Sequence, residues 1–173
     1  MTSSERPALE RMLLALADGD VQFIVCGGIA MALHGSNHVT LDLDVLVHGE
    51  RANLARLAAV VSPWRPVFRD VPGDVAVPLP ETMASGVDVV TTTTQLGDLD
   101  LFVRMAGIGV YADAVEGTSR VGVDGRELRY LSLPQLLAAK RAAGRPKDIA
   151  HIFELEALNR LREVARDDAS DAR

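Results

Sequence analysis

A chain of 173 residues, 48% of them hydrophobic, is long enough to form one domain with its own core. Its formal charge of -6 excludes a protein that binds nucleic acid through a general positive surface, so any such contact needs a local patch. The single cysteine, Cys26, has apolar neighbours and predicts a buried, reduced thiol. The chain shows no secretory signal pattern and no run near the roughly 18 apolar residues of a membrane span, which favours the cytoplasm without a membrane partner.

The first third of the chain alternates helical and strand patterns. Apolar residues recur at helical spacing in residues 5–17 and again in 51–61. Short apolar runs predict strands at 21–26 and 41–47, and two glycines after the first of these predict a turn into a short helix at 28–33. We therefore expect helices packed against a sheet.

The middle of the chain is less regular. Residues 62–85 carry most of the prolines and have weak periodicity, which predicts a long irregular connection with one short strand around Val67. Residues 87–93 are rich in β-branched side chains and 99–103 are apolar, so the two segments predict paired strands. Residues 121–130 predict a hairpin that turns at Asp124-Gly125.

Two helices are expected at the C-terminal end. Ser132, three residues before Gln135, is a capping-box signature for a helix that ends at Gly144, and Pro146 suits the first turn of a last, long helix. The fold class is therefore α/β (α+β), with a small mixed β-sheet flanked by helices. We expect a single domain over residues 1–166, with a core at about 20–131, a C-terminal helical part at about 132–166 and a disordered tail at 167–173.

The predicted strand at 41–47 contains two aspartates, Asp42 and Asp44. Residues two apart on a strand project from the same face, roughly 7 Å apart, so both carboxylates can bind metal ions from one side. Magnesium prefers such hard oxygen ligands and bridges them to nucleotide phosphates. The alternative is the solvated face of an amphipathic strand, although aspartate is a poor strand former.

Gly27 and Gly28 lie at the junction of the first predicted strand and the helix after it, and thirteen residues separate Gly28 from Asp42. Glycines at such a junction let the backbone approach a phosphate, and the helix N-terminus adds N–H groups and partial positive charge. A simple tight turn is the alternative. The pattern is neither a P-loop nor a dinucleotide fingerprint, because Gly-Lys-Ser/Thr and Gly-x-Gly-x-x-Gly are both absent.

A third carboxylate for a metal pair should come from an adjacent strand. Asp98 and Asp100 share one strand face, and Asp100 is preferred because it lies inside the apolar run, where an unpaired charge is costly. Asp98, beside Gly97, also suits a turn. Asp88 is a weaker candidate in the preceding strand.

Positive charge concentrates near the start of the last helix, at Lys140, Arg141, Arg145 and Lys147. Lysine binds phosphate as a point charge, so Lys140 and Arg145 are candidates for binding a nucleotide. Alternatively, these cations only complement the dipole of a helix end. Asp148 either favours the start of the last helix or orders Lys140 or Arg145 by pairing with it.

Two blocks of the chain resemble a known superfamily. Residues 26–35 (Cys-Gly-Gly-Ile-Ala-Met-Ala-Leu-His-Gly) and 40–44 (Thr-Leu-Asp-Leu-Asp) are similar to the polymerase-β-type nucleotidyltransferase signature. More narrowly, they resemble the bacterial AbiEii-like and related toxin-system nucleotidyltransferases. The run at 131–137 leading into 140–148 is similar to the C-terminal helical segment of that family.

The resemblance implies a magnesium-dependent enzyme with Asp42, Asp44 and Asp100 as its metal-binding carboxylates and Lys140 on the nucleotide phosphates. Such an enzyme transfers an NMP from an NTP, ATP among them, onto an acceptor hydroxyl. The resemblance favours the 3' end of a tRNA, as in toxin–antitoxin systems, with a cognate antitoxin as partner. An antibiotic hydroxyl or a protein side chain is the alternative acceptor.

One position departs from the family pattern. Members often carry an arginine two residues before the threonine, where this chain has His38. A histidine is a weaker and pH-sensitive phosphate contact, or an exposed loop residue. Ser36 and Thr40 are candidates for phosphate or ribose contacts. The substitution at His38 supports an alternative function, a catalytically silent relative that binds a nucleotide or a partner protein.

Overall fold

The computed structural model describes residues 7–37 and 39–171, and the backbone alone at residues 163–171. The first half of the chain forms α1 (Ala8–Asp18), β1 (Phe23–Val25), α2 (Gly27–Leu33), β2 (Asp42–Val47), α3 (Arg51–Val61), the 3₁₀ turn η2 (Ser62–Trp64), β3 (Val67–Phe68) and α4 (Leu79–Ala84). The second half forms β4 (Val89–Thr94), β5 (Gly97–Phe102), β6 (Arg104–Met105), β7 (Gly109–Val110), α5 (Tyr111–Ala114), η3 (Val115–Gly117), β8 (Ser119–Val123), β9 (Arg126–Tyr130), α6 (Leu133–Ala143) and α7 (Pro146–Asp171).

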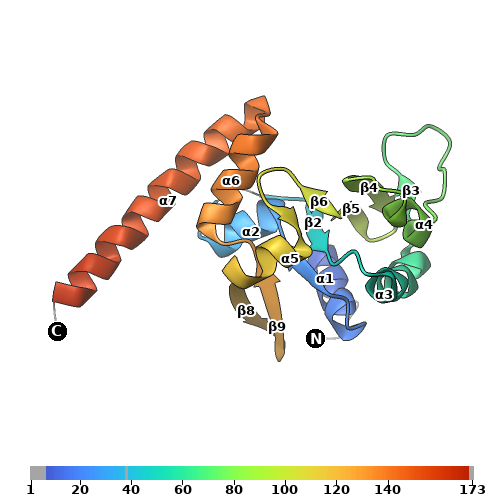
Figure 1. Cartoon of the computed structure of the whole chain (residues 1–173), viewed down its shortest axis with the longest axis horizontal. Coiled ribbons are helices and arrows are strands. Elements are labelled where there is room, and N and C mark those ends of the chain that lie inside the picture. Colours follow the sequence, from blue (N-terminus) through green and yellow to red (C-terminus); the bar gives the residue numbers. More distant parts are fainter. Residues whose placement is uncertain (1–6, 38, 172–173) are drawn as a thin grey trace.

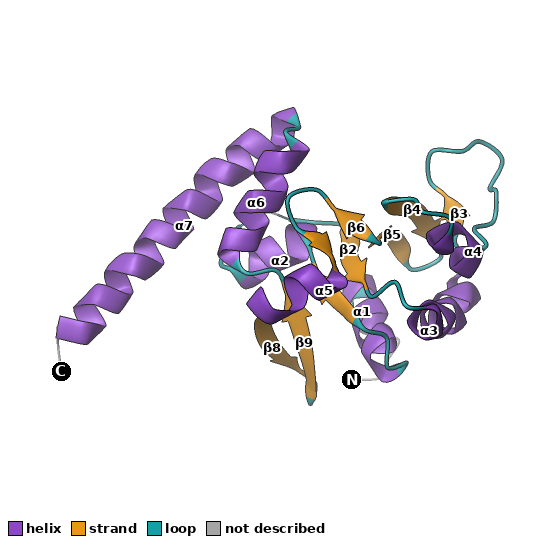
Figure 2. Ribbon diagram, viewed as in Figure 1, coloured by secondary structure: helices purple, strands orange, loops and turns teal. Residues whose placement is uncertain are grey.

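A mixed seven-stranded sheet in the order β3-β4-β5-β2-β1-β9-β8 runs through the molecule (Figure 1). β2 and β5 pair in parallel at its centre, with Asp44 opposite Asp100, whereas β1 runs antiparallel to β2. β9 joins the other side of β1 in parallel, and β6 and β7 form a separate two-stranded ribbon. The expected small mixed sheet flanked by helices is therefore confirmed (Figure 2).

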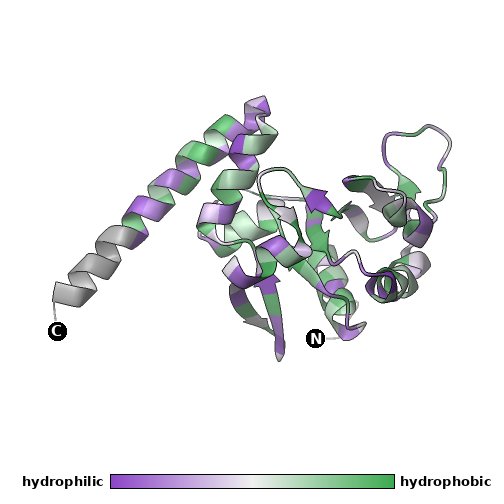
Figure 3. Cartoon of the chain, in the orientation of Figure 1, coloured by the Kyte–Doolittle hydropathy of each residue, from purple (hydrophilic) through white to green (hydrophobic). Residues whose placement is uncertain are grey.

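The strands at the centre of the sheet divide their side chains between two apolar clusters. Leu43 and Val45 of β2 and Leu99 of β5 point into a core that they share with α1, α3 and α4. The next residues along β2 point to the opposite face, where Leu46 packs with α2 and α6. Hydrophobic residues accordingly concentrate in the central strands and in α1, whereas α7 alternates in character (Figure 3).

A buried amide ties α3 to the sheet. The side chain of Asn53 is fully buried. Its Oδ1 accepts the backbone N–H of Gln22 at 2.7 Å, and its Nδ2 donates to the carbonyls of Gln22 at 3.0 Å and His48 at 2.8 Å. The side chain therefore satisfies the N–H of Gln22 and the carbonyl of His48, which flank β1 and β2, and adds a second donor to the Gln22 carbonyl, which also accepts the N–H of His48.

The C-terminal helices pack against the side of the sheet that carries α2. Ser132 and Gln135 form the expected capping box at the start of α6, and Gly144 ends this helix in the left-handed conformation with φ of 60°. The fully buried Leu155 anchors α7 in the second cluster, and Nη1 of Arg162 still lies 2.9 Å from Nδ1 of His34; the helix then extends away from the body (Figure 1). None of the described helices combines the length and the apolar character that a membrane span requires.

The predicted helices and strands are confirmed in type along most of the chain, and Cys26 is buried as expected, which raises the pKa of its thiol. The prediction of an irregular connection at 62–85 was wrong in part, because this segment also contains η2 and α4. Leu79 and Met83 bury one face of α4 against the first cluster, which stabilises a helix too short to show clear periodicity. The last helix continues to Asp171, past the predicted start of a disordered tail at 167.

We expect Asn53→Leu to lower the free energy of unfolding by about 2 to 4 kcal/mol, because it removes three hydrogen bonds between a fully buried side chain and the backbone. Urea denaturation monitored by circular dichroism measures the change. Arg51→Ala, at an exposed position of the same helix, is the matched control and should change stability by less than about 0.5 kcal/mol. Equal effects of both substitutions would contradict a special role for the amide.

Candidate functional site

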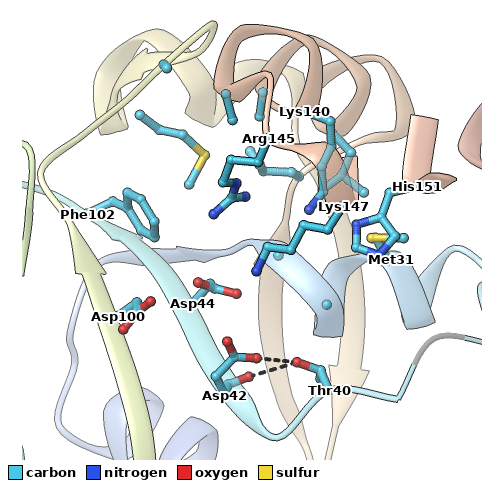
Figure 4. Close-up of a pocket in the computed structure, with 18 of the residues that line it drawn as sticks. Met31, Thr40, Asp42, Asp44, Asp100, Phe102, Lys140, Arg145, Lys147 and His151 are labelled. Carbon is cyan, nitrogen blue, oxygen red and sulfur yellow. Dashed lines mark hydrogen bonds between the residues drawn. The ribbon is translucent and has the colours of Figure 1, made fainter. Parts of the chain in front are cut away.

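A cavity of about 540 Å³ lies between the sheet and the last two helices (Figure 4). β2 and β5 contribute one wall, α2 adds Gly27 and Gly28, and α6 with the start of α7 forms the opposite wall. Of the predicted site residues, the cavity brings together Gly27, Gly28, Thr40, Asp42, Asp44, Asp100, Lys140 and Arg145. It also receives residues that the sequence did not single out as site residues, chiefly Arg69, Phe102, Met105, Lys147 and His151.

Three carboxylates converge on this cavity. In the part of the chain that the structure describes, Asp42, Asp44 and Asp100 are the one acidic group whose oxygens all lie within 4.8 Å of one another, close enough to share a metal ion. Asp98, the other candidate on β5, instead accepts the hydroxyl of Thr93 at 2.8 Å. The exposed Asp88 lies 3.7 Å from Arg104. The geometry therefore selects Asp100 as the third member.

The site raises the pKa of two of its carboxylates, Asp44 and Asp100. Burial raises the pKa of Asp44, and the negative charges of Asp42 and Asp100 raise it further, to about 6. Burial also raises the pKa of Asp100, although the guanidinium of Arg69 opposes this effect. Repulsion between like charges this close lowers the stability of the fold, and a bound cation would relieve that repulsion.

The two glycines leave room for these side chains. A Cβ at Gly27, which has φ of 52°, would overlap the carboxylate of Asp44, and a Cβ at Gly28 would overlap the side chain of Thr40. The hydroxyl of Thr40 in turn donates to the carboxylate of Asp42 (Figure 4). The glycine pair is thus required by the close approach of α2 to the residues around the carboxylates, in addition to any contact with phosphate.

Arg69 holds the third carboxylate. Its Nη2 lies 2.6 Å from Oδ1 of Asp100 and also donates to the carbonyl of Thr92 at 3.0 Å. Its Nε lies 3.3 Å from Oδ2 of Asp98. In the sequence, the only signal near Arg69 is the predicted short strand around Val67. The pairing of β3 with β4, which brings Arg69 to the site, has no signature in the sequence.

Asp148 organises the opposite, cationic wall. This fully buried carboxylate lies 3.1 Å from Nζ of Lys140 and 2.8 Å from Nε of Arg145. Burial would raise its pKa, but hydrogen bonds from Arg145 and Lys140 outweigh that effect and lower it to about 2. The sequence hypothesis that Asp148 orders these cations is confirmed. Figure 4 shows Arg145 and Lys147 directed towards the carboxylates.

Ser36, a predicted phosphate or ribose contact, is not among the residues that line the cavity. It is buried, and its N–H donates to the carbonyl of Met31 at 3.1 Å. A contact between Ser36 and a ligand stays a prediction. His38 lies outside the described residues. Arg141, also outside the cavity lining, pairs with Glu156 at 2.7 Å.

Comparison with known proteins finds solved structures with a similar fold. No family model and no curated protein matches the chain. The solution structure of the antibiotic-resistance factor ANT(2'')-Ia matches with a TM-score of 0.54 at 16% identity, covering 99% of this chain and 96% of that one. The chain therefore has the nucleotidyltransferase fold.

Two further solved structures match with lower scores. A crystal structure of ANT(2'')-Ia in complex with adenylyl-2''-tobramycin has a TM-score of 0.49 at 18% identity, covering 91% of this chain and 94% of that one. An antigenic nucleotidyltransferase-like protein from Paracoccidioides brasiliensis has a TM-score of 0.48 at 17% identity, with coverage of 95% and 91%. The narrower resemblance to AbiEii-like proteins stays a prediction.

The raised pKa of Asp44 predicts that this carboxylate destabilises the metal-free fold. Because its folded pKa of about 6 exceeds the ordinary value of 3.8, stability is full below about pH 4 and is lost as pH rises through about 6. We expect Asp44→Asn to raise the free energy of unfolding in EDTA at about pH 8 by about 2 kcal/mol, and to change it little at about pH 4.

Thermal unfolding at the two pH values, with and without Mg²⁺, measures this effect. The exposed Asp88→Asn is the control and should leave the pH dependence unchanged. A loss of stability in Asp44→Asn at the higher pH would contradict the prediction, since it would show that the carboxylate is stabilised by its surroundings.

Proposed function

We propose that this protein is a magnesium-dependent nucleotidyltransferase that moves an NMP from an NTP onto an acceptor hydroxyl. The observation that carries the proposal is the arrangement of Asp42, Asp44 and Asp100 on one wall of a cavity whose opposite wall holds Lys140 and Arg145. Separate anionic and cationic walls match a triphosphate that needs both metal ions and direct cationic contacts. The nucleotidyltransferase fold supports the same chemistry.

The carboxylate group fits Mg²⁺. All of its donors are oxygens, they converge within 4.8 Å, and their mutual repulsion raises the pKa of Asp44. Asp42 and Asp44 would hold the ion, with Asp100 as a further ligand. Bound there, Mg²⁺ would neutralise phosphate charge and favour ionisation of the attacking hydroxyl.

The protein side chains have distinct roles in the proposed transfer. Lys140 and Arg145, held by Asp148, bind the β- and γ-phosphates and offset the charge of the departing pyrophosphate. The acceptor oxygen forms a bond to the α-phosphorus while the bond from the α-phosphorus to the bridging oxygen breaks. Asp100, oriented by Arg69, is placed to accept the hydroxyl proton.

For the acceptor, we propose the 3' end of a tRNA, as the sequence resemblance implies, with a toxin role and a cognate antitoxin. ANT(2'')-Ia is an antibiotic-resistance factor, so an antibiotic hydroxyl is the second acceptor to test. The silent-relative alternative depends on His38, outside the described residues. A complete carboxylate triad facing two ordered cations favours catalysis over silent binding.

Incubation of the protein with each α-labelled NTP, Mg²⁺ and total cell RNA tests the proposal, with a parallel panel of aminoglycosides and lincosamides. We expect labelled tRNA, release of pyrophosphate, and loss of both in the Asp42→Asn, Asp44→Asn double variant. Asp88→Asn should remain fully active. Retained turnover in the double variant would refute the assignment, and label on a small molecule alone would replace tRNA with an antibiotic.

Arg69→Met should lower kcat by about tenfold or more while changing the KM for the NTP little, because Asp100 loses the group that orients it as a base. Arg69→Lys should recover part of the rate. Steady-state kinetics on whichever acceptor is labelled measures both constants. Arg104→Met, which removes an exposed arginine 3.7 Å from Asp88, is the control. An increase in KM alone would instead indicate that Arg69 binds the nucleotide.

A further inference from the structure

Besides its acidic and cationic walls, the cavity has an apolar part to which the proposed function has so far assigned no ligand group. Phe102 and Met105 line it on the side of β5 and β6, and Ala139 and Ala143 face it from α6. Phe102 and Met105 are half-buried and pack on the second apolar cluster. The cavity is therefore amphipathic, with an aromatic surface next to a carboxylate group.

The position of Phe102 follows from the strand that carries Asp100. The two residues are two apart on β5, so both side chains project from the same sheet face, roughly 7 Å apart. Figure 4 shows Phe102 beside Asp100 and on the far side of the cavity from His151.

The β6–β7 turn is packed against α6. A Cβ at Gly107, with φ of 75°, would lie 2.5 Å from the carbonyl oxygen of Ala138 and 2.9 Å from Cβ of Ala142. The turn therefore cannot move closer without a clash, nor carry a larger residue. Phe102 and Met105 line the cavity beside this turn, together with the small side chains of Ala139 and Ala143, and form an apolar surface of the kind on which a flat ring packs.

We propose that Phe102, with Met105 and the Ala139–Ala143 face of α6, is the stacking surface for the nucleobase of the bound NTP. This inference rests on the proposed nucleotidyltransferase function and assigns the nucleoside part of the same substrate. In a single NTP, the triphosphate would bind the cations directly and the carboxylates through Mg²⁺. The flat, weakly polar base would then pack on the apolar wall that contains Phe102. Stacking on an aromatic ring contributes binding energy with every base, because every base has a π-face.

The competing occupant is the acceptor. The donor nucleoside is covalently attached to the α-phosphate, so it must lie near the carboxylates. Phe102 lies two residues after Asp100 on β5, on the side of the cavity away from His151. An acceptor hydroxyl must approach opposite the leaving pyrophosphate, which the Lys140 and Arg145 wall binds. Arg69 lies 3.3 Å from Asp98 and Thr40 donates to Asp42, so both line the cavity at the end of β2 and β5 opposite Phe102, the side that we assign to the acceptor.

Calorimetric binding of the four NTPs and of inorganic tripolyphosphate, each with Mg²⁺ and without acceptor, tests the assignment. In the unmodified protein each NTP should bind more tightly than tripolyphosphate. Phe102→Ala should weaken NTP binding about fivefold to thirtyfold and leave tripolyphosphate unchanged. Lys140→Met should weaken both kinds of ligand. Phe102→Tyr should retain the affinity for NTPs.

Two controls keep the result interpretable. Phe153→Ala removes a phenylalanine that is 67% exposed on α7, outside the cavity lining, and should change nothing. Phe102→Leu keeps apolar bulk if the alanine variant unfolds, and it should still weaken NTP binding selectively. Unchanged NTP affinity in a folded Phe102 variant, or an equal loss for tripolyphosphate, would overturn the inference while the proposed function stands. Failure of every ligand to bind would overturn both.

Discussion

The parallel pairing of β2 with β5 determines where the three converging carboxylates of the site lie. In this register Asp44 is opposite Asp100. The residues that precede them on each strand, Leu43 and Leu99, point into the core shared with α1 and α3. Because side chains alternate along a strand, a slip of one residue would bury the carboxylates in that core. The cost of burying unpaired charges therefore fixes the register, and the same alternation builds the core and the site together.

The site separates its charges by giving most of them a partner of opposite sign. Asp148 holds Lys140 and Arg145 on one wall, and Arg69 holds Asp100 on the other. Asp44 differs, because burial and then the negative charges of Asp42 and Asp100 raise its pKa to about 6. Strain of this kind persists where the rest of the fold supplies enough stability, and it is typical of binding sites.

The sequence predicted what depends on local pattern and missed what depends on long-range pairing. The alternation of Asp42 and Asp44 with apolar residues, the capping box at Ser132 and the basic run near Lys140 all carry local signals, and the structure has the corresponding elements. Arg69 reaches the site only through the pairing of β3 with β4, which no local pattern encodes. Phe102 falls in the apolar run 99–103, where no sequence signal distinguishes a cavity-lining side chain from a core one, because its exposure to the cavity depends on how α6 packs.

The overall acidity of the chain and the chemistry of its cavity are independent properties. A net charge of -6 disfavours long-range attraction of a polyanion, whereas the ordered cations act within a few ångströms inside a partly enclosed cavity. A nucleotide can therefore bind by local contacts, but an RNA acceptor gains little from the outer surface. Recognition of such an acceptor would have to come from the few nucleotides at its end that enter the cavity. That restriction suits an enzyme acting on a chain terminus, and equally one acting on a compact small molecule.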